Sequence, residues 1–426
     1  MRQTLFTIDQ FLFTDHWIFG AWLLLAISYF GYQIYRGNRQ EAFGFVPVAV
    51  IGGLLIEFVL PRLATPEVDL ADPNGPLISG GLAIQGYGLF LLLAMLCGFG
   101  LALYRCRQVG YDGDQVLSLG FWMVIAGLLG ARLFYIIQKF DQFSGLQPGE
   151  MFFKFVDMTS GGLVVYGSLI GGIVAGVVYM SKKKMPWRQV IDIIAPGMVI
   201  GLAIGRIGCL MNGCCYGGVC SDGHPGLRFP AASPPYVYQF YSGKLLGITG
   251  TFDEKNYEVD VASVQDGSLA AKNGIEPGDR VRMYLVHREH QDDMQIRLRA
   301  AKAGLEKLTM NAIVVKYSAV ENTETRISIP VEQLPARSLP THPTQLYSSA
   351  NAFLLCAFLW FYYPWRRSDG EVFALMMIFY AVSRFLLELI RTDEAGQFGT
   401  SFTISQWISF GGFAFGCALL AYVRSK

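Results

Sequence analysis

The chain has 426 residues, of which 52% are hydrophobic and only 16% are charged. About a quarter of the residues of an ordinary soluble domain are charged, so the composition argues against a soluble globular protein. The formal net charge of +1 gives no reason to expect a nucleic-acid partner. The 48 glycines suit helices that pack closely in lipid, where small residues let backbones approach each other.

Long apolar runs recur along most of the chain. A helix that crosses a bilayer needs about 20 mostly apolar residues. Nine runs meet this condition, at residues 17–35, 44–60, 83–104, 116–138, 161–180, 190–212, 346–364, 371–391 and 403–423. The sequence therefore predicts an all-α polytopic membrane protein with about nine transmembrane helices.

Basic residues gather in alternate connections between these runs. The rich connections and the C-terminal tail hold Arg36, Arg39, Arg105, Arg107, Lys182, Lys183, Lys184, Arg188, Arg366, Arg367, Arg424 and Lys426. The short connections on the other side hold only Arg62, Lys139 and Lys154. Because basic loops stay in the cytoplasm, the N-terminus is predicted outside and the C-terminus inside.

A long polar segment, about 213–345, separates the sixth run from the seventh on the outer side. It contains strand-like runs, YEVDVASV, DRVRMYLV, MQIRLRAA, AIVVKYSA and TRISIP. Its GSLAAKNGIEPGD stretch at 267–279 resembles the turn and helix of a PDZ domain. In such a domain, Leu246, Gly247 and Ile248 would form the loop that receives a peptide added to a sheet edge. The alternative is a β-rich insert without a ligand.

Charged residues also lie inside the apolar runs, toward their outer ends. Arg132, Arg206 and Arg384 lie at a similar depth in three runs, with Glu388 one turn after Arg384. An arginine within a span costs a few kcal/mol, so it faces a cavity or a partner. We expect a net positive cavity that binds a phosphate, because the arginine fork gives bidentate hydrogen bonds. The alternative is that Arg384 and Glu388 only neutralise each other.

Six stretches in order carry a family resemblance. They are QGYG at 85–88, GARLFY at 130–135, GGLVVYGSLIGG at 161–172, IAPGMVIGLAIGRIGCLMNGCCYG at 194–217, HPTQLY at 342–347 and YAVSRFLLELIRTD at 380–393. Together they resemble the prolipoprotein diacylglyceryl transferase family. The resemblance implies a seven-helix core from residues 66–217 and 342–426. Residues 1–65 would then be an added transmembrane hairpin, and residues 218–341 an insert with its PDZ-like part at about 240–320.

The resemblance also implies an activity. These enzymes, in the bacterial cytoplasmic (inner) membrane, move the diacylglyceryl group of phosphatidylglycerol to the lipobox cysteine of a lipoprotein precursor. A thioether forms and glycerol phosphate leaves, without a metal or cofactor. The catalytic residues implied here are Arg206, Arg384, Glu388 and Tyr166. The substrate-binding residues are Arg206, Tyr87, Asn212, Gly217 and Arg384, to which its depth in the fourth run adds Arg132.

Three positions depart from the family pattern. Cys209 stands in place of the first asparagine of the signature, Cys214 in place of its glutamate, and Tyr166 in place of a histidine. A tyrosine with a reference pKa near 10 is a poor base at neutral pH, so the general base is unassigned.

The cysteine cluster Cys209, Cys214, Cys215 and Cys220 has several interpretations. One interpretation is a disulfide from Cys220 to Cys214 or Cys215, which the outer side of the membrane permits. The other interpretations are a metal site with His224, whose spacing matches zinc patterns poorly, and a reactive thiol. We favour a structural cluster.

The main competing function is a non-catalytic relative that binds lipid or lipoprotein, because three motif residues are replaced. An intramembrane protease would need an HExxH motif or paired aspartates within the spans, and neither is present. A transporter would be expected to show an internal repeat, and none is visible.

Overall fold

The structure is a computed structural model that describes residues 4–8, 16–54, 56–57, 82–140, 162, 164–220, 225–231, 233–253, 256–287, 310–318, 323–330, 333–391, 397 and 399–425. The chain divides into two compact units. The smaller unit contains Thr4–Gly86 and Phe134–Val164, and the larger one contains Tyr87–Leu133 and Val165–Lys426.

The smaller unit holds a helical hairpin of α2 (Trp17–Tyr35) and α3 (Arg39–Leu54). The indole nitrogen of Trp22 donates a hydrogen bond of 3.1 Å to the carbonyl of Ala49, which ties the two helices together. Strand β1 (Thr4–Ile8) pairs antiparallel with β2 (Leu82–Gln85). These residues therefore form two packed helices, the second of them 16 residues long, and the added transmembrane hairpin stays a prediction.

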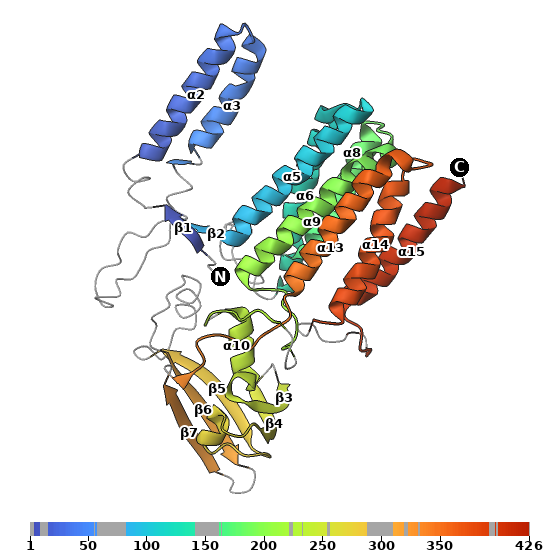
Figure 1. The fold of residues 1–426 in the computed structure, drawn as a ribbon. Coiled ribbons are helices and arrows are strands. Elements are labelled where there is room, and N and C mark those ends of the chain that lie inside the picture. Colours follow the sequence, from blue (N-terminus) through green and yellow to red (C-terminus); the bar gives the residue numbers. More distant parts are fainter. Residues whose placement is uncertain are drawn as a thin grey trace. The chain divides into compact units, whose positions relative to one another are not determined.

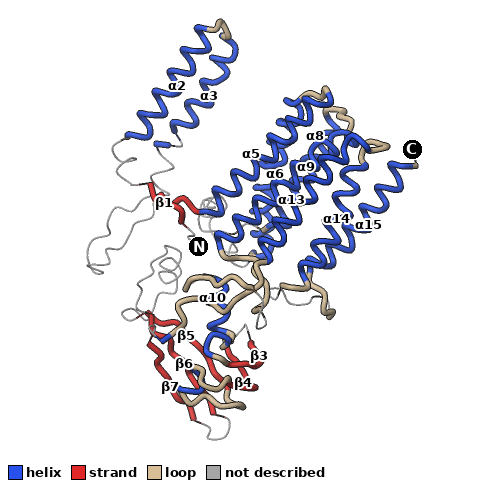
Figure 2. The backbone as a smooth tube through the Cα atoms, in the orientation of Figure 1, coloured by secondary structure: helices blue, strands red, loops and turns tan. Residues whose placement is uncertain are grey.

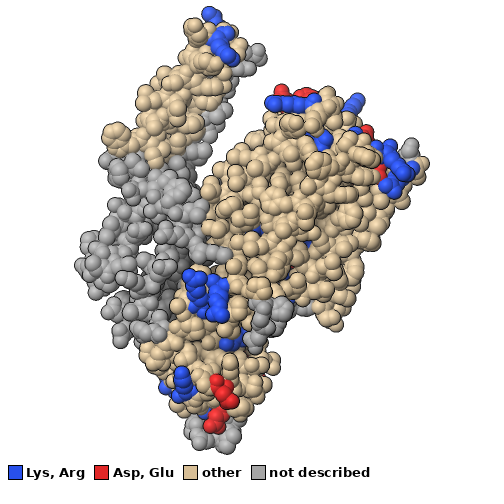
Figure 3. Space-filling model, viewed as in Figure 1, with Lys and Arg blue, Asp and Glu red and all other residues tan. Residues whose placement is uncertain are grey.

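The larger unit is a bundle of seven helices, which lie side by side in Figure 1 and Figure 2. They are α5 (Gly86–Val109), α6 (Gly113–Gln138), α8 (Val165–Lys182), α9 (Trp187–Asn212), α13 (Thr344–Tyr362), α14 (Glu371–Glu388) and α15 (Ile404–Arg424). Each covers one of the predicted core spans to within a few residues. Figure 3 shows a broad flank of this bundle that is largely free of charged side chains.

Seven of the described helices are long and apolar enough to cross a membrane, namely α2, α5, α6, α8, α9, α13 and α15. The protein is therefore a multi-pass membrane protein. Helix α3 falls short in its described length, and α14 contains three charged residues, Glu371, Arg384 and Glu388. The carboxylate of Glu371 accepts hydrogen bonds from Arg424 and from the Tyr362 hydroxyl, so its charge is compensated where α14 begins and α15 ends. The count of nine spans stays a prediction.

Glycines set the spacing of neighbouring helices. A β-carbon added to Gly130 of α6 would lie 2.4 Å from the carbonyl oxygen of Gly167 in α8. A β-carbon on Gly197 of α9 would likewise lie 2.5 Å from the carbonyl oxygen of Gly98 in α5. At both crossings the backbones touch, and no larger residue fits without moving a helix.

The insert between α9 and α13 contains an antiparallel sheet in the order β3-β4-β5-β6-β7. Its strands are β3 (Ile248–Asp253), β4 (Glu258–Val264), β5 (Arg280–His287), β6 (Met310–Ser318) and β7 (Thr323–Pro330). Helix α10 (Pro234–Tyr241) contributes Tyr236 and Phe240 to the core of this sheet. Four of the five predicted strands are confirmed, and the fifth, at 294–301, lies outside the described residues.

The stretch that resembles a PDZ turn forms a short helix, α11 (Leu269–Lys272). The Ser268 hydroxyl caps it by accepting a hydrogen bond of 3.2 Å from the backbone nitrogen of Ala271. The small β sheet of the insert is thus established, and its likeness to a PDZ domain stays a prediction.

Candidate active site

Most of the predicted site residues lie at one end of the bundle (Figure 1). Successive helices run in opposite directions, so the C-terminal ends of α6, α9 and α14 lie beside the N-terminal ends of α5, α8, α13 and α15. Arg132, Arg206 and Arg384 each lie in the last third of a helix. Tyr87 and Tyr166 are each the second residue of a helix, α5 and α8. This antiparallel order brings residues far apart in the sequence to one end.

Arg206 lies six residues before the end of α9 and is half-buried. Its charge interacts with the side chains of Cys209, Cys215, Tyr380 and Arg391. The Nε atom is buried and has no hydrogen-bond partner among the described residues. A buried donor without a partner is unfavourable, so this guanidinium is suited to an external acceptor such as a phosphate.

Glu388 of α14 lies between two arginines. Its Oε2 atom is 2.7 Å from Nη1 of Arg384 and 3.4 Å from Nη1 of Arg391. The Arg384 Nη2 atom also donates a hydrogen bond of 2.9 Å to the Ser405 hydroxyl of α15. The predicted neutralising pair between Arg384 and Glu388 is therefore present. With Arg206 and Arg391 the group is still net positive.

Tyr87 and Asn212 lie beside this cationic group. The Tyr87 ring packs against Gly208 of α9, where an added β-carbon would lie 3.4 Å from the Cδ2 atom of the ring. The Tyr87 hydroxyl interacts electrostatically with Arg206 and with the nearby cysteines. Asn212 ends α9, and its side chain interacts with the Cys214 thiol. These positions are consistent with substrate contact by both residues.

Gly217 is buried in the segment that follows α9. Its backbone nitrogen donates a hydrogen bond of 2.9 Å to the carbonyl of His342, and it forms a bridge with Arg391. An added β-carbon would lie 2.7 Å from Cβ of His342 and 2.9 Å from Cγ2 of Thr344. Gly217 therefore positions this segment between α13 and the end of α14.

Arg132 and Tyr166 come from α6 and α8. The Arg132 side chain is almost completely buried, with 2% of it exposed, and Tyr166 is half-buried in the first turn of α8. Their catalytic and binding roles stay predictions.

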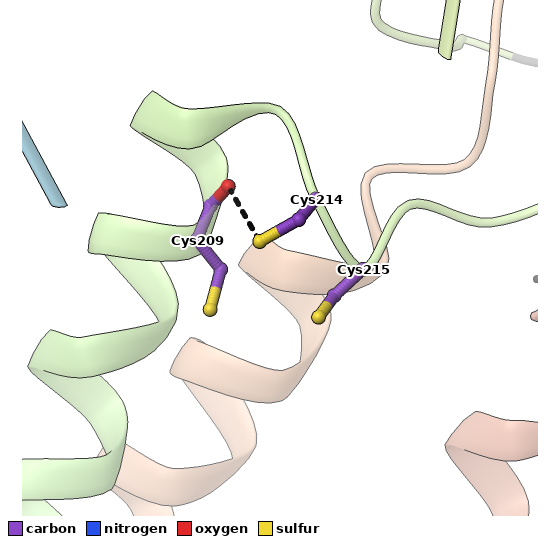
Figure 4. A group of neighbouring side chains, drawn as sticks. All are labelled: Cys209, Cys214 and Cys215. Carbon is purple, nitrogen blue, oxygen red and sulfur yellow. Dashed lines mark hydrogen bonds between the residues drawn. The ribbon is translucent and has the colours of Figure 1, made fainter. Parts of the chain in front are cut away.

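Three cysteines converge at the end of α9 (Figure 4). The Sγ atoms of Cys209, Cys214 and Cys215 all lie within 4.8 Å of one another. All eight cysteines of the chain are free thiols, so the disulfide to Cys220, one of the interpretations above, is not formed. Cys220 packs elsewhere, against Gly226 and Pro340, and His224 lies outside the described residues.

The loop predicted to bind a peptide lies within the insert. Leu246 and Ile248 are almost fully buried in the core of the sheet. The backbone nitrogens of Leu246 and Ile248 donate to the Gly243 carbonyl, and that of Gly247 donates to the Lys244 carbonyl. A bound carboxylate would have to replace these hydrogen bonds.

Sequence reasoning missed the residues that hold the segment after α9. The Thr344 hydroxyl donates a hydrogen bond of 2.6 Å to the carbonyl of Cys215, and Nε2 of Gln345 donates one of 2.7 Å to the carbonyl of Cys214. Both belong to the HPTQLY stretch, which was a signal for the family but not for this contact. Ser405, the partner of Arg384, gave no signal in the sequence.

Comparisons with known proteins bear on the family of the chain. A profile described as prolipoprotein diacylglyceryl transferase matches residues 76–422. The phosphatidylglycerol--prolipoprotein diacylglyceryl transferase of Rhodopirellula baltica is 35% identical over 450 residues, covering 96% of this chain and 86% of the relative. The second such transferase of Clostridium perfringens is 25% identical, covering 78% of this chain and 90% of the relative. The chain belongs to the prolipoprotein diacylglyceryl transferase family.

Proposed function

We propose that this protein transfers the diacylglyceryl group of phosphatidylglycerol to the thiol of the lipobox cysteine of a lipoprotein precursor. The products are a thioether and glycerol phosphate, and the reaction is the first step of lipoprotein maturation. Family membership supports this function, as does the printed activity of relatives that cover most of the chain.

The observation that carries the proposal is the unpartnered buried Nε atom of Arg206 in a net positive group. The lipid head group is a phosphate anion, and arginine binds phosphate through its planar fork. Arg391 lies near Arg206 and shares Glu388 with Arg384, and this carboxylate neutralises only one of the two. We assign phosphate binding to Arg206 and Arg384.

The same residues serve the chemical step. As the bond between the glyceryl carbon and the phosphate oxygen breaks, negative charge grows on the leaving phosphate. Arginines held in place beforehand stabilise this charge without reorganisation. Glu388 orients Arg384 through their ion pair, and Tyr87, Asn212 and Arg132 line the substrate site. Tyr166 is kept as a candidate hydrogen-bond donor to the substrate.

The proposed setting is the bacterial inner membrane. The basic connections place the C-terminus in the cytoplasm and the insert and N-terminus in the periplasm. In this orientation the candidate site lies toward the outer leaflet, because the insert leaves the bundle at the same end as Arg206. Secreted precursors and phosphatidylglycerol both reach that side.

The insert offers a second binding surface. Strand β3 pairs with β4 on one side, and its second edge pairs with no strand among the described residues, so this is the edge to which a peptide strand could add. We propose this edge of the PDZ-like insert as a docking place for precursor peptides. Cross-linking of the full-length protein to photoreactive peptides tests it, and labels confined to the bundle would refute it.

The function is tested by transfer of labelled diacylglyceryl from phosphatidylglycerol to a lipobox peptide by the purified protein. Arg206→Ala and Arg384→Ala are each expected to lower kcat/KM at least about tenfold, which corresponds to about 1.4 kcal/mol. Arg206→Lys keeps the charge but loses the fork, so it should restore only part of the activity. Lys183→Ala, in an exposed connection between α8 and α9, is the control and should leave the rate unchanged.

No transfer by the folded protein, with the lipid present, would overturn the proposal. It would favour the alternative of a relative that binds lipid or lipoprotein without catalysis, in which Cys209, Cys214 and Tyr166 have replaced needed residues.

A further inference from the structure

The three thiols at the end of α9 form the one group of this kind among the described residues whose ligand atoms are close enough to share a metal ion. Cys209 comes from the last turn of the helix, and Cys214 and Cys215 come from the segment after it (Figure 4). All three side chains are half-buried. The Cys214 thiol donates a hydrogen bond of 3.7 Å to the carbonyl of Cys209.

The distances suit a metal bound by sulfur. A zinc–sulfur bond is about 2.3 Å long, so the sulfurs around a tetrahedral zinc ion are about 3.8 Å apart. The sulfurs here lie within 4.8 Å of one another. Rotamer adjustments of about 1 Å or less would therefore bring them into coordination without moving the helices.

The backbone that carries the thiols is held in place. Gly213 ends α9 with a left-handed φ of 76°, which turns the chain back over the helix end. Cys215 also has a left-handed φ of 59°, which is uncommon for a residue with a side chain. The hydrogen bonds from Thr344 and Gln345 to the carbonyls of Cys215 and Cys214 fix this conformation. The thiols are thus presented by a rigid segment.

Cationic side chains lie near the thiols, and a thiolate is the form that binds metals. The charge of Arg206 acts on Cys209 and Cys215, and that of Arg391 acts on Cys215. The same arginines would balance the negative charge of a site made from several thiolates.

We propose that Cys209, Cys214 and Cys215 bind a zinc ion with one coordination position open, and that this position binds the thiolate of the acceptor cysteine. Thiolate ligands select zinc among the common divalent ions, and three protein ligands with an open position are the pattern of a catalytic zinc site. The inference rests on the proposed function and adds a cofactor to it, although the family resemblance implies none.

The site would replace a missing general base. Tyr166 stands where the family pattern has a histidine, and the general base is unassigned. A thiol that coordinates a metal ion loses its proton, so no general base is required. Two of the three ligands, Cys209 and Cys214, are themselves replacements of the family's motif residues. The loss of the base and the gain of the thiols thus have one explanation.

The step balances in atoms and charge. The acceptor thiol releases its proton to water as its sulfur binds the zinc ion. That sulfur then attacks the glyceryl carbon that carries the phosphate and forms the carbon–sulfur bond. The carbon–oxygen bond breaks, and its electron pair leaves on the oxygen of glycerol phosphate, beside Arg206. No oxidant or reductant takes part.

The first test is metal binding by the full-length protein, purified under reducing conditions. Elemental analysis should find about one zinc per chain, and cobalt(II) in its place should give the intense sulfur-to-cobalt charge-transfer absorption of a thiolate site. Cys209→Ser, Cys214→Ser and Cys215→Ser should each lower the zinc content at least about tenfold at a fixed competing chelator concentration. Cys97→Ser, at an exposed position in α5, is the matched control and should keep one zinc.

The second test separates this inference from the proposed function. Removal of zinc by a chelator should lower transferase activity at least about tenfold, and added zinc should restore it. Full activity of the zinc-free protein and of the three serine variants would overturn the inference and leave the proposed function intact. If neither form transfers diacylglyceryl, the activating role falls with the proposed function, while zinc content and the cobalt spectrum still decide whether the site exists.

A disulfide is the remaining alternative for this cluster. If mass spectrometry finds two of the three cysteines joined in the protein as isolated, and the reduced protein binds neither zinc nor cobalt(II), the zinc site is refuted.

Discussion

The Nη1 atom of Arg384 lies 2.7 Å from the Oε2 atom of Glu388, one turn further along α14. The Glu388 side chain has no exposed surface, and the same Oε2 atom also forms an ion pair with Arg391. Removing one partner of a buried ion pair costs about 3–5 kcal/mol, because the other charge is left without compensation. Since the arginines keep some exposure, we expect a smaller cost here.

Glu388→Gln and Arg384→Gln should therefore each destabilise the protein, and the double variant should lose less than the sum. The coupling should exceed about 0.5 kcal/mol in a double-mutant cycle of thermal unfolding in detergent. Additive losses would contradict the pairing of these two residues. The same variants should lower kcat more than they raise KM. Glu388→Gln leaves Arg384 without the partner that orients it, and Arg384→Gln removes its charge, so in both the leaving phosphate is less well stabilised.

Thr344 supports the segment that carries the cysteines. Its hydroxyl donates to the carbonyl of Cys215, and this bond joins α13 to a residue 129 positions earlier. Thr344→Val keeps the shape but leaves the carbonyl without its donor, so we expect at least a fivefold loss of transferase activity. Thr344→Ser keeps the donor and should lose less than twofold. Equal activity of the two variants would show that the hydrogen bond has no role.

The sequence was sufficient to predict the bundle, because apolar length and basic connections are local properties. The helices of the bundle were predicted within a few residues. They include α14, whose three charged residues exclude it from simple hydropathy criteria. The motif arginines were also found from sequence, since a charge in an apolar run stands out. Residue type and depth single out Arg206 and Arg384 as candidates, and their catalytic roles stay predictions.

Contacts between distant segments were not predictable in the same way. The spacing of Cys209, Cys214 and Cys215 matches no common zinc pattern, and their convergence depends on the left-handed turn at Gly213. The hydrogen bonds from Thr344 and Gln345 depend on how α13 packs against α9. No periodicity in a single segment carries that information.

Gly217 leaves no room for a side chain. Gly217→Ala would place a methyl group 2.7 Å from Cβ of His342, so the segment after α9 must shift away from α13. We expect a lower melting temperature and at least a tenfold loss of activity. Gly100→Ala is the control, because nothing lies within 4 Å of its added β-carbon and alanine favours a helix by about 0.5–1 kcal/mol. Equal behaviour of the two variants would contradict the close packing at Gly217.

The thiols of Cys215 and Cys220 should differ in their response to pH. Hydrogen bonds from neighbouring thiols and the charge of Arg206 lower the pKa of Cys215, whereas burial raises the pKa of Cys220. Because only the thiolate reacts with iodoacetamide, Cys215 of the reduced, metal-free protein should be alkylated at neutral pH, and Cys220 only at a higher pH.

Mass spectrometry of peptides alkylated across a pH series measures both profiles. Arg206→Gln removes a charge that favours the thiolate, so it should move the profile of Cys215 to higher pH and leave that of Cys220 unchanged. Arg228→Gln is the matched control, because Arg228 interacts with neither thiol in the described part of the chain, and it should move neither profile. Coincident profiles of Cys215 and Cys220 in the parent protein would show that the cationic group does not act on the cluster.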